Sequence, residues 1–167
     1  MKSLRSSFFC LWLSTFAVVA QSQSDDRVDT IGPARCHDYN AILDVTAQNT
    51  PHDKLIIVIA RLGDGETRSN LNWRRLHNVR TYWTEYYLDK RKQDMIVLAV
   101  GERVQGHGRV ELYVGGKLIA MLKLRRNADL VIGECYTTPE GTPFCDDEMN
   151  RGFYPCRDKS SRSKRRR

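Results

Sequence analysis

The sequence contains no apolar run long enough to cross a membrane as a helix. Its longest, from Phe8 to Ala20, has 13 residues, whereas a membrane-spanning helix needs about 20. Basic residues precede the run, and the small residues Val18-Val19-Ala20 at its end are typical of a signal-peptidase site. These features predict a signal peptide over residues 1–20 and an exported product, either periplasmic or secreted.

Cysteine is scarce, and the sequence has no Cys-x-x-Cys pair of the kind that structural zinc sites use. Beyond the signal peptide, four cysteines remain: Cys36, Cys135, Cys145 and Cys156. An even number in an exported chain favours two disulfides, and all three pairings are open. We expect them to stabilise a cysteine-containing extension over residues 133–158, which is rich in Pro, Gly and acidic residues.

The chain has little excess of charge outside its C-terminus. Of its 27 basic residues, two lie in the signal peptide and six in the tail from Lys159 to Arg167, so 19 remain against 20 acidic residues. A nucleic-acid-binding domain carries its charge on a folded face, so we expect no nucleic-acid partner. The tail, 159–167, is interpreted as a disordered, solvated end. Weak electrostatic contact with an anionic envelope surface is the alternative.

No catalytic or metal-binding pattern is evident either. The four histidines are scattered, with no pair at metal-ligand spacing on a helix, and no serine lies in a nucleophile elbow. Glu66, Glu102 and Glu111 supply carboxylates, but nothing in their spacing sets the separation that a glycosidase needs. We therefore predict a non-catalytic protein without a metal or a cofactor.

The apolar pattern predicts one α+β domain over residues 36–132, after a polar linker at 21–35. Its order is helix, strand, helix, then three strands, arranged as a two-layer sandwich with two helices on a mixed three- to four-stranded sheet. The β-branched run "KLIIVIARL" indicates a strand buried on both faces. Glycines predict tight turns. The expected helices are 38–49 and about 70–88, the strands are 54–62 and a second from Met95, and the turns are 105–108 and 115–116.

Arg75 is the unusual residue of the second helix, because helical spacing places it on the apolar face between Leu71 and Val79. A permanently charged guanidinium in that position needs a carboxylate. A ligand could supply it. Alternatively, the carboxylate is internal, from Asp64, Glu66 or Glu111, and the pattern does not choose between these readings.

Three stretches resemble one family. "SNLNWRRLHNVRTYW" is similar to the helix motif of OmpA-like domains, which outer-membrane protein A shares with peptidoglycan-associated lipoproteins, and Arg75 stands at the family's arginine. "VGERV" and "GRVELYV" resemble the family's later strands, with Arg109 and Glu111 at matching positions. The match spans about residues 42–114. It implies a divergent, shortened OmpA-like domain.

The resemblance also implies a function, namely binding of the diaminopimelate stem of peptidoglycan. Asp64 would pair with the ammonium group of the ligand and Arg75 with its carboxylate, aided by the free N–H groups of the helix N-terminus. Asn70, Asn72 and Arg109 complete the expected ligand-binding set. The competing roles are a turn residue for Asp64, helix caps for the asparagines and a cross-strand partner for Arg109.

A second function remains open at this stage. The chain can equally be a secreted, disulfide-stabilised protein-interaction module that uses the fold only as a scaffold. In that case the partner would be another protein, and the segment Cys135–Cys156, with its acidic patch Asp146-Asp147-Glu148, would be the contact surface.

Overall fold

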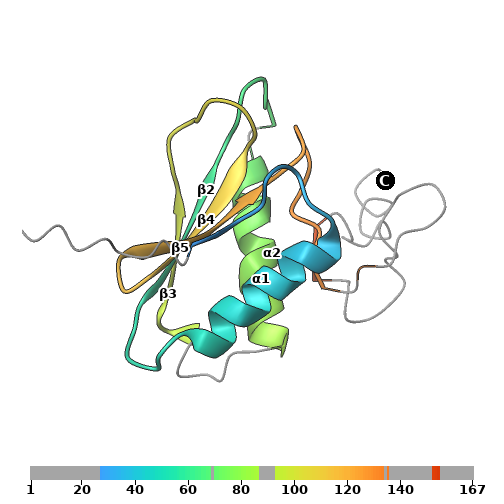
Figure 1. Cartoon of the computed structure of the whole chain (residues 1–167). Coiled ribbons are helices and arrows are strands. Elements are labelled where there is room, and N and C mark those ends of the chain that lie inside the picture. Colours follow the sequence, from blue (N-terminus) through green and yellow to red (C-terminus); the bar gives the residue numbers. More distant parts are fainter. Residues whose placement is uncertain (1–26, 69, 87–92, 134, 136–151, 155–167) are drawn as a thin grey trace, which may run out of the picture.

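The computed structural model describes residues 27–68, 70–86, 93–133, 135 and 152–154 (Figure 1). These residues contain two helices and five strands, and no described helix has the length and apolar character that a membrane span requires. The elements are β1 Val28–Asp29, α1 Cys36–Asn49, β2 Ile56–Arg61, α2 Leu71–Tyr86, β3 Ile96–Val100, β4 Arg109–Val114 and β5 Lys117–Lys123.

The strands form one mixed sheet in the order β1-β5-β4-β2-β3. The α+β class is confirmed, but the sheet has five strands and not three or four. The additional strand, β1, lies in the segment 21–35 that we predicted as linker, and it pairs in parallel with β5 at Ala120 and Met121. Two residues of pairing are too short to leave a periodic signal in the sequence.

The two predicted glycine turns differ in whether the strands that they connect pair with each other. Gly115 and Gly116, with φ of +56° and +86°, close the antiparallel β4–β5 hairpin, as expected for glycines in a two-residue turn. The turn at 105–108 instead connects strands that do not pair, because β2 lies between β3 and β4. This arrangement makes β2 the central partner of both: it is parallel to β3 and antiparallel to β4.

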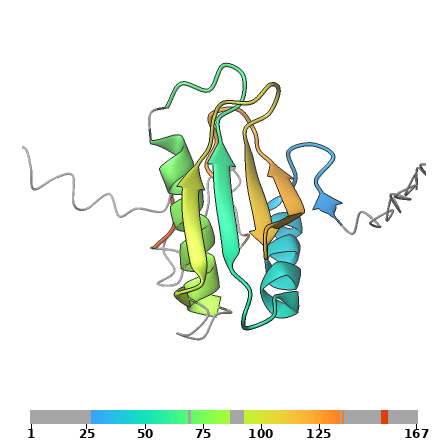
Figure 2. The same ribbon diagram turned by 90° about the vertical axis from the view of Figure 1, so that its left-hand side faces the viewer.

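Both helices pack on the same face of the sheet, and the opposite face is covered by neither (Figure 2). The prediction that residues 54–62 are buried on both faces is therefore wrong. β2 alternates between fully and partly buried residues, with Val58 in the core and Ile57 and Ile59 on the face without helices. We call this second face, which carries Ile57, Ile59, Arg61, Val97, Arg109, Glu111, Tyr113 and Met121, the open sheet face.

A disulfide joins Cys36, at the start of α1, to Cys135, with Cα atoms 5.4 Å apart. Asn40, one turn along α1, reinforces the connection: its amide donates to the carbonyl oxygen of Gly133 (2.6 Å) and accepts from its N–H (3.1 Å). The start of the predicted extension is thus attached to α1. Cys145 and Cys156 lie outside the described residues, as do Asp146-Asp147-Glu148, the tail and the predicted signal peptide.

Candidate functional site

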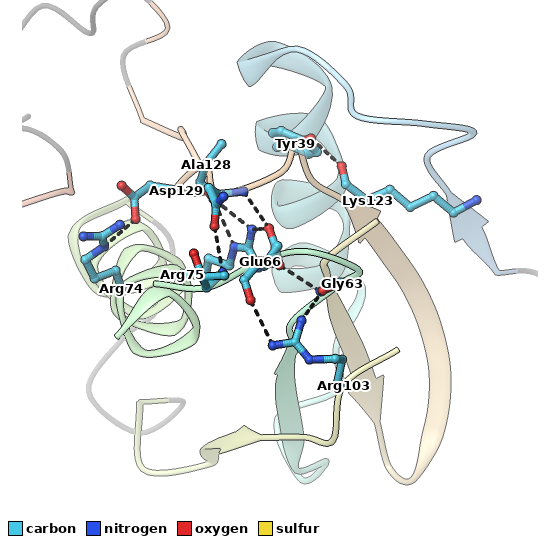
Figure 3. Close-up of polar contacts among 11 residues, drawn as sticks. Tyr39, Gly63, Glu66, Arg74, Arg75, Arg103, Lys123, Ala128 and Asp129 are labelled. Atoms are coloured by element: carbon cyan, nitrogen blue, oxygen red, sulfur yellow. Dashed lines mark hydrogen bonds and ion pairs between the residues drawn. The ribbon is translucent and has the colours of Figure 1, made fainter. Parts of the chain in front are cut away.

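Arg75 lies in the first turns of α2 and is completely buried, with 0% of its surface exposed. Its carboxylate partner is Glu66, which is 1% exposed and lies in the loop between β2 and α2. The pair is bidentate: Nη1 donates to Oε2 (3.0 Å) and Nη2 to Oε1 (2.5 Å). Nε and Nη2 also donate to the carbonyl oxygen of Ala128, at 3.1 and 2.9 Å (Figure 3). Every nitrogen of the guanidinium is therefore engaged inside the protein.

Glu66 is equally well satisfied. Oε2 accepts the N–H of Gly63 (2.8 Å) and Oε1 that of Asn127 (3.0 Å). Burial by itself would raise the pKa of the Glu66 carboxyl, but the Arg75 guanidinium and the two amides outweigh it and hold that pKa below its usual range. The group is therefore an ionised carboxylate at neutral pH, as a buried ion pair requires.

Close packing encloses this ion pair. A Cβ on Gly108 would lie 2.2 Å from Oε2 of Glu66 and 2.7 Å from Nη1 of Arg75, so no side chain fits there. Arg103 donates to the carbonyl oxygens of Gly63 and Glu66 and thereby ties the β3–β4 connection to the same loop (Figure 3). Through its hydrogen bonds the ion pair joins three segments of the chain, namely the β2–α2 loop, α2 and residues 127–128, which is the role of a structural element.

The expected geometry of Asp64 and Arg75 is wrong. Asp64 is exposed and serves the neighbouring turn, where its Oδ2 accepts the N–H of Gly106 (2.6 Å). Among the internal carboxylates considered for Arg75, the structure selects Glu66, because the turn at Asp64 and Gly65 directs the chain back over the helix start. A small zwitterion thus finds no exposed acid–arginine pair at this position.

Of the two asparagines, only Asn70 stands where a helix cap was expected: it directly precedes α2, and its carbonyl oxygen accepts the N–H of Arg74 (3.1 Å). Asn70 is exposed. Asn72 is inside the helix and 5% exposed, and its Oδ1 has no hydrogen-bond partner among the described residues. Neither side chain makes a hydrogen bond to the Arg75–Glu66 pair in the described part of the chain. The expected ligand-binding set is therefore not assembled in one place.

Arg109 belongs to a different cluster, which includes a residue that the sequence analysis missed. On the open sheet face, Arg61 and Arg109 are directly opposed across β2 and β4, and both donate from Nε to Glu111, at 3.0 and 2.7 Å. Tyr113 also donates to Glu111 (3.1 Å). The cross-strand role considered for Arg109 is not what the structure shows, because Arg109 pairs with Glu111 on its own strand and its cross-strand neighbours are Arg61 and Lys123. Arg61 was overlooked because it ends the apolar run "IIVIAR", where only the strand register shows its neighbours.

Glu111 is 2% exposed although it lies on the face without helices. Burial would raise the pKa of its carboxyl, but the guanidinium groups of Arg61 and Arg109 outweigh this effect and lower it. In turn, the hydrogen bond to Glu111 raises the pKa of Arg61. We refer to Arg61, Arg109 and Glu111 as the arginine cluster. Nothing in the described part of the chain groups three or more His, Cys, Asp or Glu residues around a metal position.

These two buried glutamates predict how stability depends on pH. Because the pKa values of Glu66 and Glu111 are lower in the folded state, their stabilisation is complete above the unfolded value of about 4.5 and is lost as the pH falls below it. Two such groups give a slope of up to about 2.7 kcal/mol per pH unit. Urea unfolding at pH 7, 5, 4 and 3 measures it, and a free energy of unfolding that rises on acidification would contradict both ion-pair assignments.

In comparisons with known proteins, the chain matches no protein-family model, no curated protein and no solved structure.

Proposed function

We propose that this chain is an exported, non-catalytic protein-interaction module, in which an OmpA-like fold serves as a scaffold and the open sheet face receives the partner. The observation that carries the proposal is that the guanidinium group of Arg75 is closed to an external ligand. Its guanidinium is fully buried and each of its nitrogens already donates to Glu66 or Ala128. A ligand carboxylate could reach Arg75 only by displacing Glu66 from four hydrogen bonds.

The open sheet face has the features expected of a surface that binds a protein partner. No described helix covers it (Figure 2), and it exposes apolar surface at the sheet edge, where Val97 on β3 is 44% exposed. Apolar side chains around a small number of charged groups are typical of protein-binding surfaces. The apolar N-terminal run and the Cys36–Cys135 disulfide support export.

A second candidate is the peptidoglycan binding that the family resemblance implies. One observation favours it: Glu66 makes to Arg75 the bidentate contacts that a ligand carboxylate would make. If the loop 64–70 opened, a diaminopimelate carboxylate could take the place of Glu66. This candidate requires an equilibrium between closed and open loops, and a ligand can shift such an equilibrium only by its preference for the open state.

One experiment separates the two candidates. Thermal unfolding and co-sedimentation with purified peptidoglycan are measured for the full chain with and without millimolar diaminopimelate. The scaffold proposal expects no shift in melting temperature and no competition, either for the wild type or for Asp64→Asn. A diaminopimelate-dependent rise in melting temperature that Asp64→Asn removes would establish the peptidoglycan candidate instead.

A second experiment locates the partner surface. A photo-crosslinking amino acid is introduced at Val97, on the open sheet face, and in a matched variant at Arg80, an exposed position on α2. The proposal expects a discrete adduct with one protein in the native host from position 97 and none from position 80. Adducts from position 80 alone would place the interface on the helical side and contradict the proposal.

A further inference from the structure

We propose that the arginine cluster binds carboxylates of an acidic peptide segment on the open sheet face. The inference rests on the proposed function, because it names the chemistry by which a protein partner would be held. It does not involve Arg75, whose guanidinium is closed, and it assigns Arg61, which the sequence pattern did not identify.

Several N–H donors of Arg61 and Arg109 are still available to a ligand. A guanidinium has five N–H donors. Within the described residues, Arg61 and Arg109 both donate from Nε to Glu111, and Arg61 also interacts with the hydroxyl of Tyr113. The other N–H groups of the two guanidinium groups make no further hydrogen bond to those residues. They provide two planar forks that can each meet a carboxylate with two parallel hydrogen bonds.

The charges of the arginine cluster do not balance. Two guanidinium groups share the single carboxylate of Glu111, so the cluster carries a net positive charge. Lys123 on β5, the cross-strand neighbour of Arg109, extends the row, with its Nζ 3.3 Å from the carbonyl oxygen of Ile31. Adjacent strands are about 4.8 Å apart. The row of cations therefore spans about 10 Å, a length that about three residues of an extended peptide cover.

The arginine cluster is preorganised and accessible. Glu111 is held by three donors and is 3% exposed in its side chain, whereas the side chains of Arg61 and Arg109 are 23% and 28% exposed. Gly101 leaves room for Arg61, since a Cβ there would lie 2.6 Å from its Nη1. Two fixed guanidinium groups lose little side-chain freedom on binding, which favours affinity.

The surroundings favour a peptide over a phosphate-bearing surface. Along the same face, Ile59 and Met121 flank Glu111 on the neighbouring strands, and Ile57 lies further along β2. A peptide can place apolar side chains on these residues while its carboxylates meet the arginines. A lipid headgroup or an inorganic anion would use only the charged end of the face.

Binding of fluorescein-labelled hexaglutamate to the full chain, followed by fluorescence anisotropy in about 150 mM salt, tests the inference. Arg61→Gln and Arg109→Gln should each weaken binding at least tenfold, while Arg80→Gln, which removes an exposed cation from α2, should change it less than twofold. The same series is repeated with Arg165→Ser, Arg166→Ser and Arg167→Ser, so that the basic tail does not mask the effect. Thermal unfolding of each variant shows whether it is folded.

Arg109→Lys keeps the charge and loses the fork, so it should bind more weakly than the wild type if bidentate contacts matter. Equal weakening by all three Gln variants, or binding that disappears with the tail arginines alone, would overturn the inference. So would tighter binding to phosphatidylglycerol vesicles than to hexaglutamate. If the adduct from Val97 persists unchanged in Arg61→Gln and Arg109→Gln, the interaction function stands and the arginine cluster is not its site.

Discussion

Replacing Arg75 with methionine is expected to lower the free energy of unfolding by about 3–5 kcal/mol, because Glu66 would remain buried without its cation. Glu66 is 1% exposed and its remaining partners are two backbone amides, which satisfy hydrogen bonds but do not neutralise the charge. The carbonyl oxygen of Ala128 would also lose both of its donors from Arg75. Urea unfolding of the wild type and of Arg75→Met measures the difference.

Two further variants give this prediction its control. Arg80→Met removes an exposed arginine from the same helix and should change stability by less than about 0.5 kcal/mol. The double variant Glu66→Gln with Arg75→Met should be more stable than Arg75→Met alone, because no buried charge is left unpaired. If Arg75→Met lowered the free energy of unfolding by less than about 1 kcal/mol, the ion pair would not be structural. The hypothesis that Arg75 binds a ligand would then be favoured again.

Loss of the disulfide between Cys36 and Cys135 is expected to cost about 2–5 kcal/mol. The two cysteines are 99 positions apart, so the bond closes a loop that contains nearly the whole sheet. In the chain-entropy account, a bridge over about 100 residues removes more freedom from the unfolded chain than a short one does. In the folded state the disulfide holds the Gly133 segment against α1, where Asn40 also binds it.

The measurement compares unfolding of Cys36→Ser/Cys135→Ser with that of Cys145→Ser/Cys156→Ser in the same urea series. The first double variant should be the less stable of the two and should lose the protection of the Asn40–Gly133 hydrogen bonds in amide exchange. Identical stability of this variant and the wild type would show that packing alone holds the segment in place.

Local sequence pattern predicted most helices and strands of the domain, although not β1. Helical spacing predicted α1 and α2, β-branched runs predicted β2 and β3, and Gly115-Gly116 predicted the β4–β5 hairpin. The same spacing placed Arg75 on the apolar face of α2, and there the structure shows it buried and closed to a ligand. These features depend on residues within a few positions of one another, so the spacing of residues in the sequence is enough to predict them.

Contacts between residues far apart in the chain could not be predicted from the local sequence pattern. Glu66 was one of three internal carboxylates considered for Arg75. The choice came from the turn at Asp64 and Gly65 and from the room that Gly108, 42 positions beyond Glu66, leaves for the pair. The identity of the disulfide is a similar case, since four cysteines allow three pairings and only the folded chain brings Cys135 to Cys36.

Local sequence pattern alone predicted the α+β class of the fold and the need of Arg75 for a carboxylate, and export stays a prediction from the N-terminal residues. Only the tertiary structure decided the order of the strands, the burial of that carboxylate and the meeting of Arg61 and Arg109 over Glu111. The physical reason is that helix and strand propensities act between near neighbours, whereas strand register and ion-pair partners are set by how segments far apart in the chain pack together.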